Sequence, residues 1–152
     1  MGLLSAFSRR PFLTETERAQ IEAGLATARR HAGAPLGLVI DKEPMGDPGV
    51  RVEELFREWD VPEAERQTAV LVYACAATRR FAVAGGEVIR RTAPQAFWET
   101  LDRDLTRHFE EGRYCDGLFK AVANAAIMQH SLFVAADRCH SRPLPPPEES
   151  DQ

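Results

Sequence analysis

Apolar and polar positions alternate along the chain in patterns that predict helices and strands. Apolar residues recur at helical spacing within residues 15–32, which predicts the first helix. Thr14 and Glu17 have the spacing of a capping box at its start. Gly33 follows, and a glycine at this point is predicted to end the helix in the left-handed backbone conformation. A helix bounded by such signals is predicted to bury one face and leave the other in water.

Three short apolar runs predict strands. Residues 35–40 and 68–75 are almost continuously apolar, which is typical of central strands buried on both faces. Residues 78–84 follow the second run so closely that the two must form an antiparallel hairpin. After a glycine turn, residues 88–90 predict a further edge strand.

Helical spacing also predicts a helix over residues 49–59, another from Pro94 to Gly112, and a last one over residues 114–136. A capping box of Thr92 and Gln95 is predicted before the second of these. In the last helix, the residues predicted to face the core are Leu118, Val122, Ala125, Met128, Leu132 and Phe133.

The element order is helix, strand, helix, strand, strand, helix, helix. One βαβ crossover plus a hairpin makes a small mixed β-sheet, and helices on both faces would bury it. The predicted fold class is therefore α/β, a three-layer α/β/α sandwich. The division is a leader over residues 1–12, one α/β domain over residues 13–137, and a proline-rich acidic tail over residues 138–152, predicted to be disordered.

Composition narrows the function classes. The chain has 152 residues and a net charge of −4, which argues against a nucleic-acid binder, since such proteins need a basic surface. No stretch approaches the roughly 20 apolar residues of a membrane span. Three widely spaced cysteines suggest no disulfide framework, and we expect a soluble, cytoplasmic protein.

The N-terminal segment allows two interpretations. It carries Leu3, Leu4 and Phe7, followed by Arg9 and Arg10. These apolar side chains can pack on the domain as an extended arm. Alternatively, residues 1–11 form a weak membrane-surface anchor, with the arginines meeting lipid head groups.

The order and spacing of several segments resemble one known family, the TPM domain. The resemblance covers residues 12–134 and is nearest to a short, soluble bacterial branch. It is carried by these segments: Leu13-Thr14-x-x-Glu17, Leu38-Val39-Ile40, Leu55-Phe56 with Trp59, Ala69 to Tyr73, Arg79 to Val83, Phe97-Trp98, and Phe109-x-x-Gly112-x-Tyr114-x-x-Gly117-Leu118.

The resemblance implies an α/β/α sandwich around a mixed sheet. It also implies functions of other members: some plant members are described as acid phosphatases, and some members bind calcium or another divalent cation through acidic loop residues. This sequence departs from the family where such chemistry would lie. It has Gln67-Thr68-Ala69 instead of an Asp-Asn-Gly or Arg-Asn-Gly turn, and Ala93 where an aspartate tends to fall.

We therefore expect a non-catalytic binding or accessory module with an unidentified protein partner. The alternative is a metal-dependent phosphatase using Ca²⁺ or Mg²⁺. No cofactor is expected. For the alternative, the candidate metal ligands are Asp41, Glu43 and Asp47 in the loop after the first strand, together with Glu87. The competing interpretation is a solvated loop in which Asp47 caps the next helix.

An anion site is the other candidate. Gly85 and Gly86 can let backbone N–H groups approach an anion, and Arg79 and Arg80 can receive a phosphate or an acidic partner. Arg90 and Arg91 would flank the same end of the hairpin. The competing interpretations are a simple glycine turn and solvated arginines that protect an edge strand from aggregation.

Overall fold

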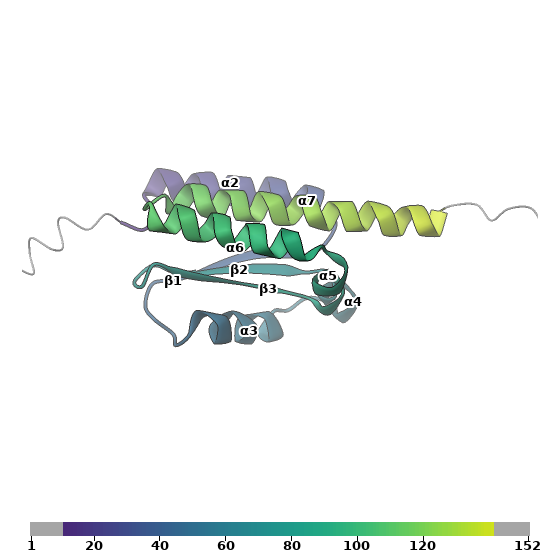
Figure 1. Cartoon of the computed structure of the whole chain (residues 1–152), viewed down its shortest axis with the longest axis horizontal. Helices are drawn as coiled ribbons and strands as arrows, with labels where there is room; N and C mark the ends of the chain where they lie inside the picture. Colours follow the sequence, from purple (N-terminus) through teal and green to yellow (C-terminus); the bar gives the residue numbers. More distant parts are fainter. Residues whose placement is uncertain (1–10, 142–152) are drawn as a thin grey trace, which may run out of the picture.

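A three-stranded sheet forms the middle layer of the domain. The computed structural model describes residues 11–141, with side chains through residue 135. The elements follow in the order α2 (Glu15–Ala32), β1 (Leu36–Asp41), α3 (Pro48–Glu58), α4 (Glu63–Arg66), β2 (Val70–Cys75), β3 (Arg80–Gly85), α5 (Glu87–Thr92), α6 (Gln95–Glu110) and α7 (Tyr114–Ser141). Helices α2, α6 and α7 cover one face of the sheet and α3 covers the other (Figure 1). The predicted three-layer α/β/α sandwich is confirmed.

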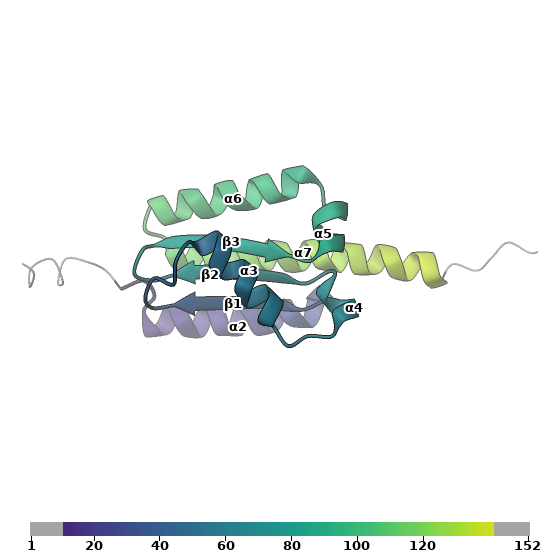
Figure 2. The same cartoon turned by 90° about the horizontal axis from the view of Figure 1, so that it is seen from below.

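The strands pair in the order β1-β2-β3. Strand β1 runs parallel to β2, with Leu36 opposite Val70 and Asp41 opposite Cys75. Strand β3 returns antiparallel, with Arg80 opposite Cys75. The crossover from β1 to β2 passes through α3, which lies across the lower face of the sheet (Figure 2). Every residue of β2 is buried, so the prediction of a central strand is confirmed for β2. The same prediction is wrong for β1, which lies at an edge of the sheet and has four of its six residues only partly buried.

The two faces of β2 belong to two separate cores because successive side chains of a strand point in opposite directions. Val70 and Val72 face the larger core, between the sheet and helices α2, α6 and α7. Leu71 and Tyr73 face a smaller core under α3, where they meet Phe56. Burial on both sides explains why this segment is continuously apolar.

Helix α2 has the bounds that its sequence predicts. The hydroxyl of Thr14 accepts a hydrogen bond from the backbone N–H of Glu17 at 3.1 Å. The Glu17 carboxylate accepts one from the backbone N–H of Thr14 at 3.0 Å. The helix ends at Gly33, whose φ of 73° lies in the left-handed region. The predicted capping box and stop are both confirmed.

The predicted edge strand over residues 88–90 is wrong, because this segment lies in helix α5. The backbone N–H groups of Val88 and Ile89 donate to the carbonyl of Gln67 at 3.0 and 3.1 Å. Those donors are therefore not available for strand pairing. The Ile89 side chain is buried in the larger core, which holds the segment as a helix. Helix α4 was not predicted.

Two finer predictions about the helices also need correction. Pro94, not Thr92, occupies the N-cap of α6 and no side chain caps it. The Thr92 hydroxyl donates instead to the carbonyl of Val88 at 2.7 Å, within its own helix. On α7, Leu118 is buried as predicted but Phe133 is 53% exposed, because it lies outside the stripe that faces the sheet.

Helix α7 corrects the expectation about membrane spans in one respect. Among the described residues, Tyr114–Ala135 is long and apolar enough to cross a membrane, with a mean hydropathy of 1.2. A core helix has the same composition, and one third of this stretch is buried inside the domain. Its inner side chains, such as Leu118, Val122 and Ala125, belong to the larger core. Its apolar character is thus partly explained by packing on the sheet.

Candidate functional site

The carboxyl end of the parallel strand pair carries Asp41, the last residue of β1. This edge of an open α/β sheet is where ligands commonly bind. One Asp41 carboxylate oxygen, Oδ2, accepts a hydrogen bond from Arg51 Nε of α3 at 3.0 Å. The same oxygen accepts another from the Tyr73 hydroxyl at 2.8 Å. Asp41 is therefore already engaged by a fixed cation and a fixed donor.

The electrostatics of this trio agree with the geometry. The hydrogen bond that Arg51 donates to the Asp41 carboxylate raises the pKa of Arg51. Burial of the Tyr73 ring, followed by its bond to Asp41, raises the pKa of the Tyr73 hydroxyl. Both donors therefore hold their protons more firmly than in water. The trio is a stable neutralised cluster beneath the carboxyl edge.

The other candidate metal ligands do not gather around Asp41. Asp47 caps α3, where its Oδ2 accepts from the backbone N–H groups of Gly49 and Val50 at 3.0 and 3.2 Å. The competing interpretation of Asp47 as a cap is confirmed. Glu43 is exposed in the loop.

Glu87 lies beyond Gly85, which pairs with the first residue of β2, whereas Asp41 lies beside the last. A six-residue strand separates these ends by roughly 17 Å. Glu87 instead pairs with Arg91 at 3.6 Å. Within residues 11–135 no three His, Cys, Asp or Glu side chains are grouped to hold a metal. Calcium or magnesium needs six or more oxygen ligands, and the predicted set does not fit one ion.

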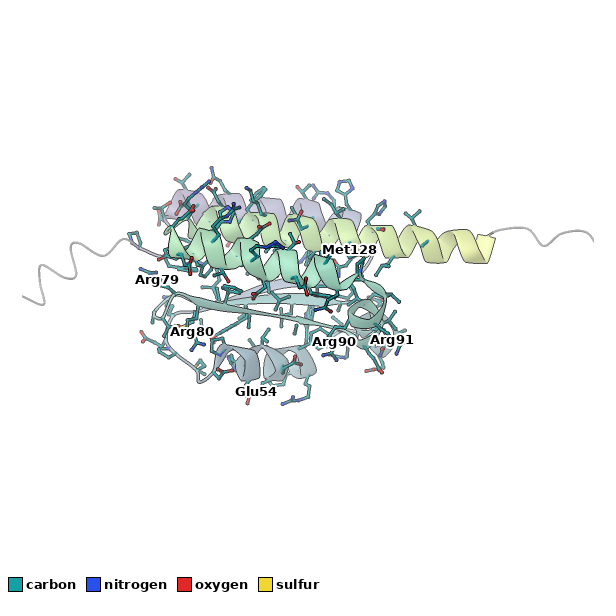
Figure 3. The ribbon with its side chains drawn as sticks, viewed as in Figure 1. Glu54, Arg79, Arg80, Arg90, Arg91 and Met128 are labelled. Carbon is teal, nitrogen blue, oxygen red and sulfur yellow. The ribbon has the colours of Figure 1, made fainter. Side chains whose placement is uncertain are left out.

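The candidate anion site is likewise divided between two places. Figure 3 shows Arg79 and Arg80 at one end of the sheet and Arg90 and Arg91 at the other. The prediction that these pairs flank one end of the hairpin is therefore not met. The Arg79 guanidinium lies over two aromatic rings, 5.5 Å from the centre of Phe12 and 5.1 Å from that of Tyr114. Through these two cation–π contacts, Arg79 links Phe12, which precedes α2, to Tyr114, the first residue of α7.

The glycine pair is packed against protein rather than open to a ligand. The backbone N–H of Gly86 donates to the carbonyl of Ala69 at 2.9 Å. A Cβ added at Gly86 would lie 2.0 Å from the carbonyl oxygen of Arg66. This glycine is required because two backbone segments approach closely. It leaves no space at this point for an anion.

A wide hollow of the described surface lies on the helical layer, between α2 and α7. This groove encloses about 830 Å³, within the usual size of a binding site. We call it the α2/α7 groove. The residues that shape it are mainly small or apolar, including Ala23, Gly24, Phe119, Ala123, Ala126 and Ile127.

Two large apolar side chains of the groove are exposed to water. Ile127 is 67% exposed and Phe119 is 42% exposed. The Phe119 ring lies across Gly24, where an added Cβ would approach it within 2.5 Å. Because Gly24 has no side chain, the Phe119 ring can lie directly on the backbone of α2. Apolar groups that remain in water between two helices are typical of an interaction surface.

The sequence of α7 carries a signal for this surface besides the stripe that faces the sheet. Phe119, Ala123, Ile127 and His130 recur at intervals of three and four residues. This is a second helical stripe, displaced by one position from the stripe that faces the sheet. A helix with two apolar stripes has either two buried faces or one binding face. The spacing of residues in α7 does not indicate that α2 is the helix that lies beside this second stripe.

A family model of the TPM domain matches residues 9–127, in agreement with the resemblance seen in the sequence. Among solved structures, the BA42 protein of the psychrophilic bacterium Bizionia argentinensis has a TM-score of 0.68 at 21% identity, over 79% of this chain and 83% of that one. The N-terminal domain of a protein from P. gingivalis has a TM-score of 0.61 at 17% identity, over 80% and 78%.

The N-terminal domain of the cg2496 protein from Corynebacterium glutamicum has a TM-score of 0.57 at 9% identity, over 77% of this chain and 74% of that one. At these identities the likeness is one of fold. A search of curated proteins gave no match.

Proposed function

The chain belongs to the TPM domain family, and on that premise we propose that it is a non-catalytic binding module that receives a protein partner in the α2/α7 groove. The observation that carries the proposal is the exposed apolar stripe of Phe119 and Ile127 beside a groove of about 830 Å³. Large apolar side chains in a concave, weakly charged surface favour a partner that brings apolar side chains of its own.

The carboxyl edge of the sheet supports the non-catalytic part of the proposal. A metal-dependent phosphatase needs carboxylates that are free to coordinate an ion and to orient a phosphate. Here Asp41 is neutralised by Arg51 and bonded by Tyr73, and Asp47 is used as a helix cap. Replacing these protein donors with a metal would first require breaking both sets of bonds.

A phosphatase assay tests this part directly. Phosphomonoesters supplied with Mg²⁺, Ca²⁺ or Mn²⁺ are expected to show no turnover above a protein-free control. Robust turnover that is abolished by Asp41→Ala would refute the proposal and establish the alternative, a metal-dependent phosphatase. Because Asp41 also holds Arg51 and Tyr73, folding of the variant must be verified by circular dichroism.

Partner binding is tested with a photo-crosslinking residue at Ile127 and a matched one at Val50. Both positions are exposed β-branched residues, at 67% and 59%, but Val50 lies on α3, across the sheet. A partner captured at Ile127 and not at Val50 is expected to bind the purified chain in calorimetry. That binding should weaken at least tenfold in Ile127→Glu and be unchanged in Val50→Glu. Equal loss in both variants, or none in either, would count against the groove.

A further inference from the structure

We propose that the N-terminal segment of this same chain, residues 2–7, docks in the α2/α7 groove and competes there with the partner. The proposal rests on the proposed function for what it regulates, but it has separate evidence. Three features carry it: the end at which the chain enters the domain, the length of the segment, and its apolar side chains.

The chain enters the domain at one end of the groove. Phe12 stacks on Tyr114, the first residue of α7, with ring centres 4.9 Å apart. The next residue, Cys115, lines the groove, and its thiol contacts the carbonyl oxygen of Glu17 at 3.8 Å. The start of α2 and the start of α7 thus lie together, and both helices run side by side from this end (Figure 1). Residue 11 therefore lies at the end of the domain where both α2 and α7 begin.

Residues 1–10 are long enough to fill the groove from that point. On α2 the groove extends from Gln20 to His31, a rise of roughly 16 Å at 1.5 Å per residue. Ten extended residues reach roughly 33 Å. The segment can therefore turn back at Pro11 and reach the groove, where the four steps from Leu3 to Phe7 span at most roughly 13 Å of its length.

The side chains of the segment match the surface they would cover. Leu3, Leu4 and Phe7 are the large apolar residues of the segment. Small residues such as Ala23 and Ala123 leave space between the helices. A volume near 830 Å³ has room for a few inserted side chains. A short tether also gives the segment a millimolar effective concentration at the groove. The tether therefore favours the N-terminal segment of the same chain over a second copy as the occupant of the groove.

The test uses the full chain with labelled leucine and isoleucine methyl groups. Nuclear Overhauser contacts between the methyls of Leu3 or Leu4 and those of Ile127 are expected. The double variant Leu3→Asp/Leu4→Asp should abolish these contacts and shift the Ile127 methyl signal. The matched control Ser5→Asp/Ser8→Asp adds the same charge to the segment without removing apolar groups, and it should retain the contacts.

Three results would overturn the inference. The first is an absence of contacts together with an Ile127 signal that is unchanged in the leucine variant. The second is a signal that depends on protein concentration but not on Leu3 and Leu4, which indicates a second copy. The third is a signal that changes only on adding phosphatidylcholine–phosphatidylglycerol vesicles, which indicates a membrane surface. Partner binding that depends on Ile127 without segment contacts would leave the proposed function intact and refute only this inference.

Discussion

Gln129 of α7 is expected to join the helical layer to the sheet, and its replacement tests the packing described above. The side chain is 1% exposed. Its amide nitrogen donates to the carbonyl of Pro35 at 2.8 Å and to that of Thr68 at 3.0 Å. Pro35 directly precedes strand β1, and Thr68 lies two residues before strand β2. One amide therefore holds the starts of both strands and the middle of α7 together.

The cost of losing this amide can be worked from its partners. The Pro35 carbonyl also accepts from the backbone N–H of Val70 at 3.0 Å, so it would lose a second bond, about 1 kcal/mol. The carbonyl of the half-buried Thr68 would lose its bond from Gln129, at about 1–3 kcal/mol. Gln129→Met also removes the amide oxygen, which has no partner among the described residues, and this relief offsets about 1 kcal/mol. The net loss is about 2 kcal/mol.

Urea unfolding followed by circular dichroism measures the loss. About 2 kcal/mol corresponds to a fall in Tm of roughly 4–8 °C for a domain of this size. Asn124→Met makes a similar change at an exposed position of the same helix and should stay within about 0.5 kcal/mol of the parent. Equal stability of both variants would refute the reasoning.

Gln129→Glu provides an internal check on the role of the amide. A carboxylate cannot donate to two carbonyl oxygens, and burial raises its pKa. Because the folded variant then binds more protons than the unfolded chain, its stability falls as pH rises above about 4.3. The deficit relative to the parent should shrink on acidification. A deficit independent of pH would show that shape, not hydrogen bonding, matters at this position.

Three further variants test other parts of the fold. Gly117→Ala places a Cβ 2.9 Å from that of His108, so α6 and α7 must separate, and thermal unfolding should show a loss of about 1–3 kcal/mol. Asp47→Ala removes the cap of α3 and should cost about 1 kcal/mol in urea unfolding, equally with and without millimolar calcium. Tyr73→Phe removes the bond to Asp41 and the raised pKa of Tyr73. Since that shift makes the parent lose stability above about pH 10, denaturation in alkali should show a smaller decline in the variant.

Most of the fold was predictable because its elements depend on local patterns. The capping box of Thr14, the continuous apolar run of β2 and the tight hairpin to β3 each lie within a few neighbouring residues. The failure at residues 88–90 has a non-local cause, since the Gln67 carbonyl that receives Val88 and Ile89 lies about twenty residues earlier in the chain. β-Propensity alone could not reveal that acceptor.

The candidate site was less predictable for the same reason. The carboxylates at residues 41–47 were visible in the sequence, but their partners were not. Asp41 is bonded to Tyr73, 32 residues away, through a side chain that the sequence presents as part of an apolar strand. Spacing identified Asp47 as a cap because the cap and Pro48 are adjacent. It could not show that an arginine of the crossover helix occupies the position of a cation next to Asp41.

The distribution of charge favours the proposed binding surface on the helical layer. The outer surface of α3 carries charged residues such as Glu53, Arg57 and Glu58, which are exposed and keep that face in water. The α2/α7 groove instead exposes Phe119 and Ile127. Neither residue is needed to cover the sheet, since the larger core is closed by other side chains of α7. Exposed apolar side chains lower solubility, and these two do not contribute to packing inside the domain. Their presence is explained if a second surface, from this chain or from a partner, covers them.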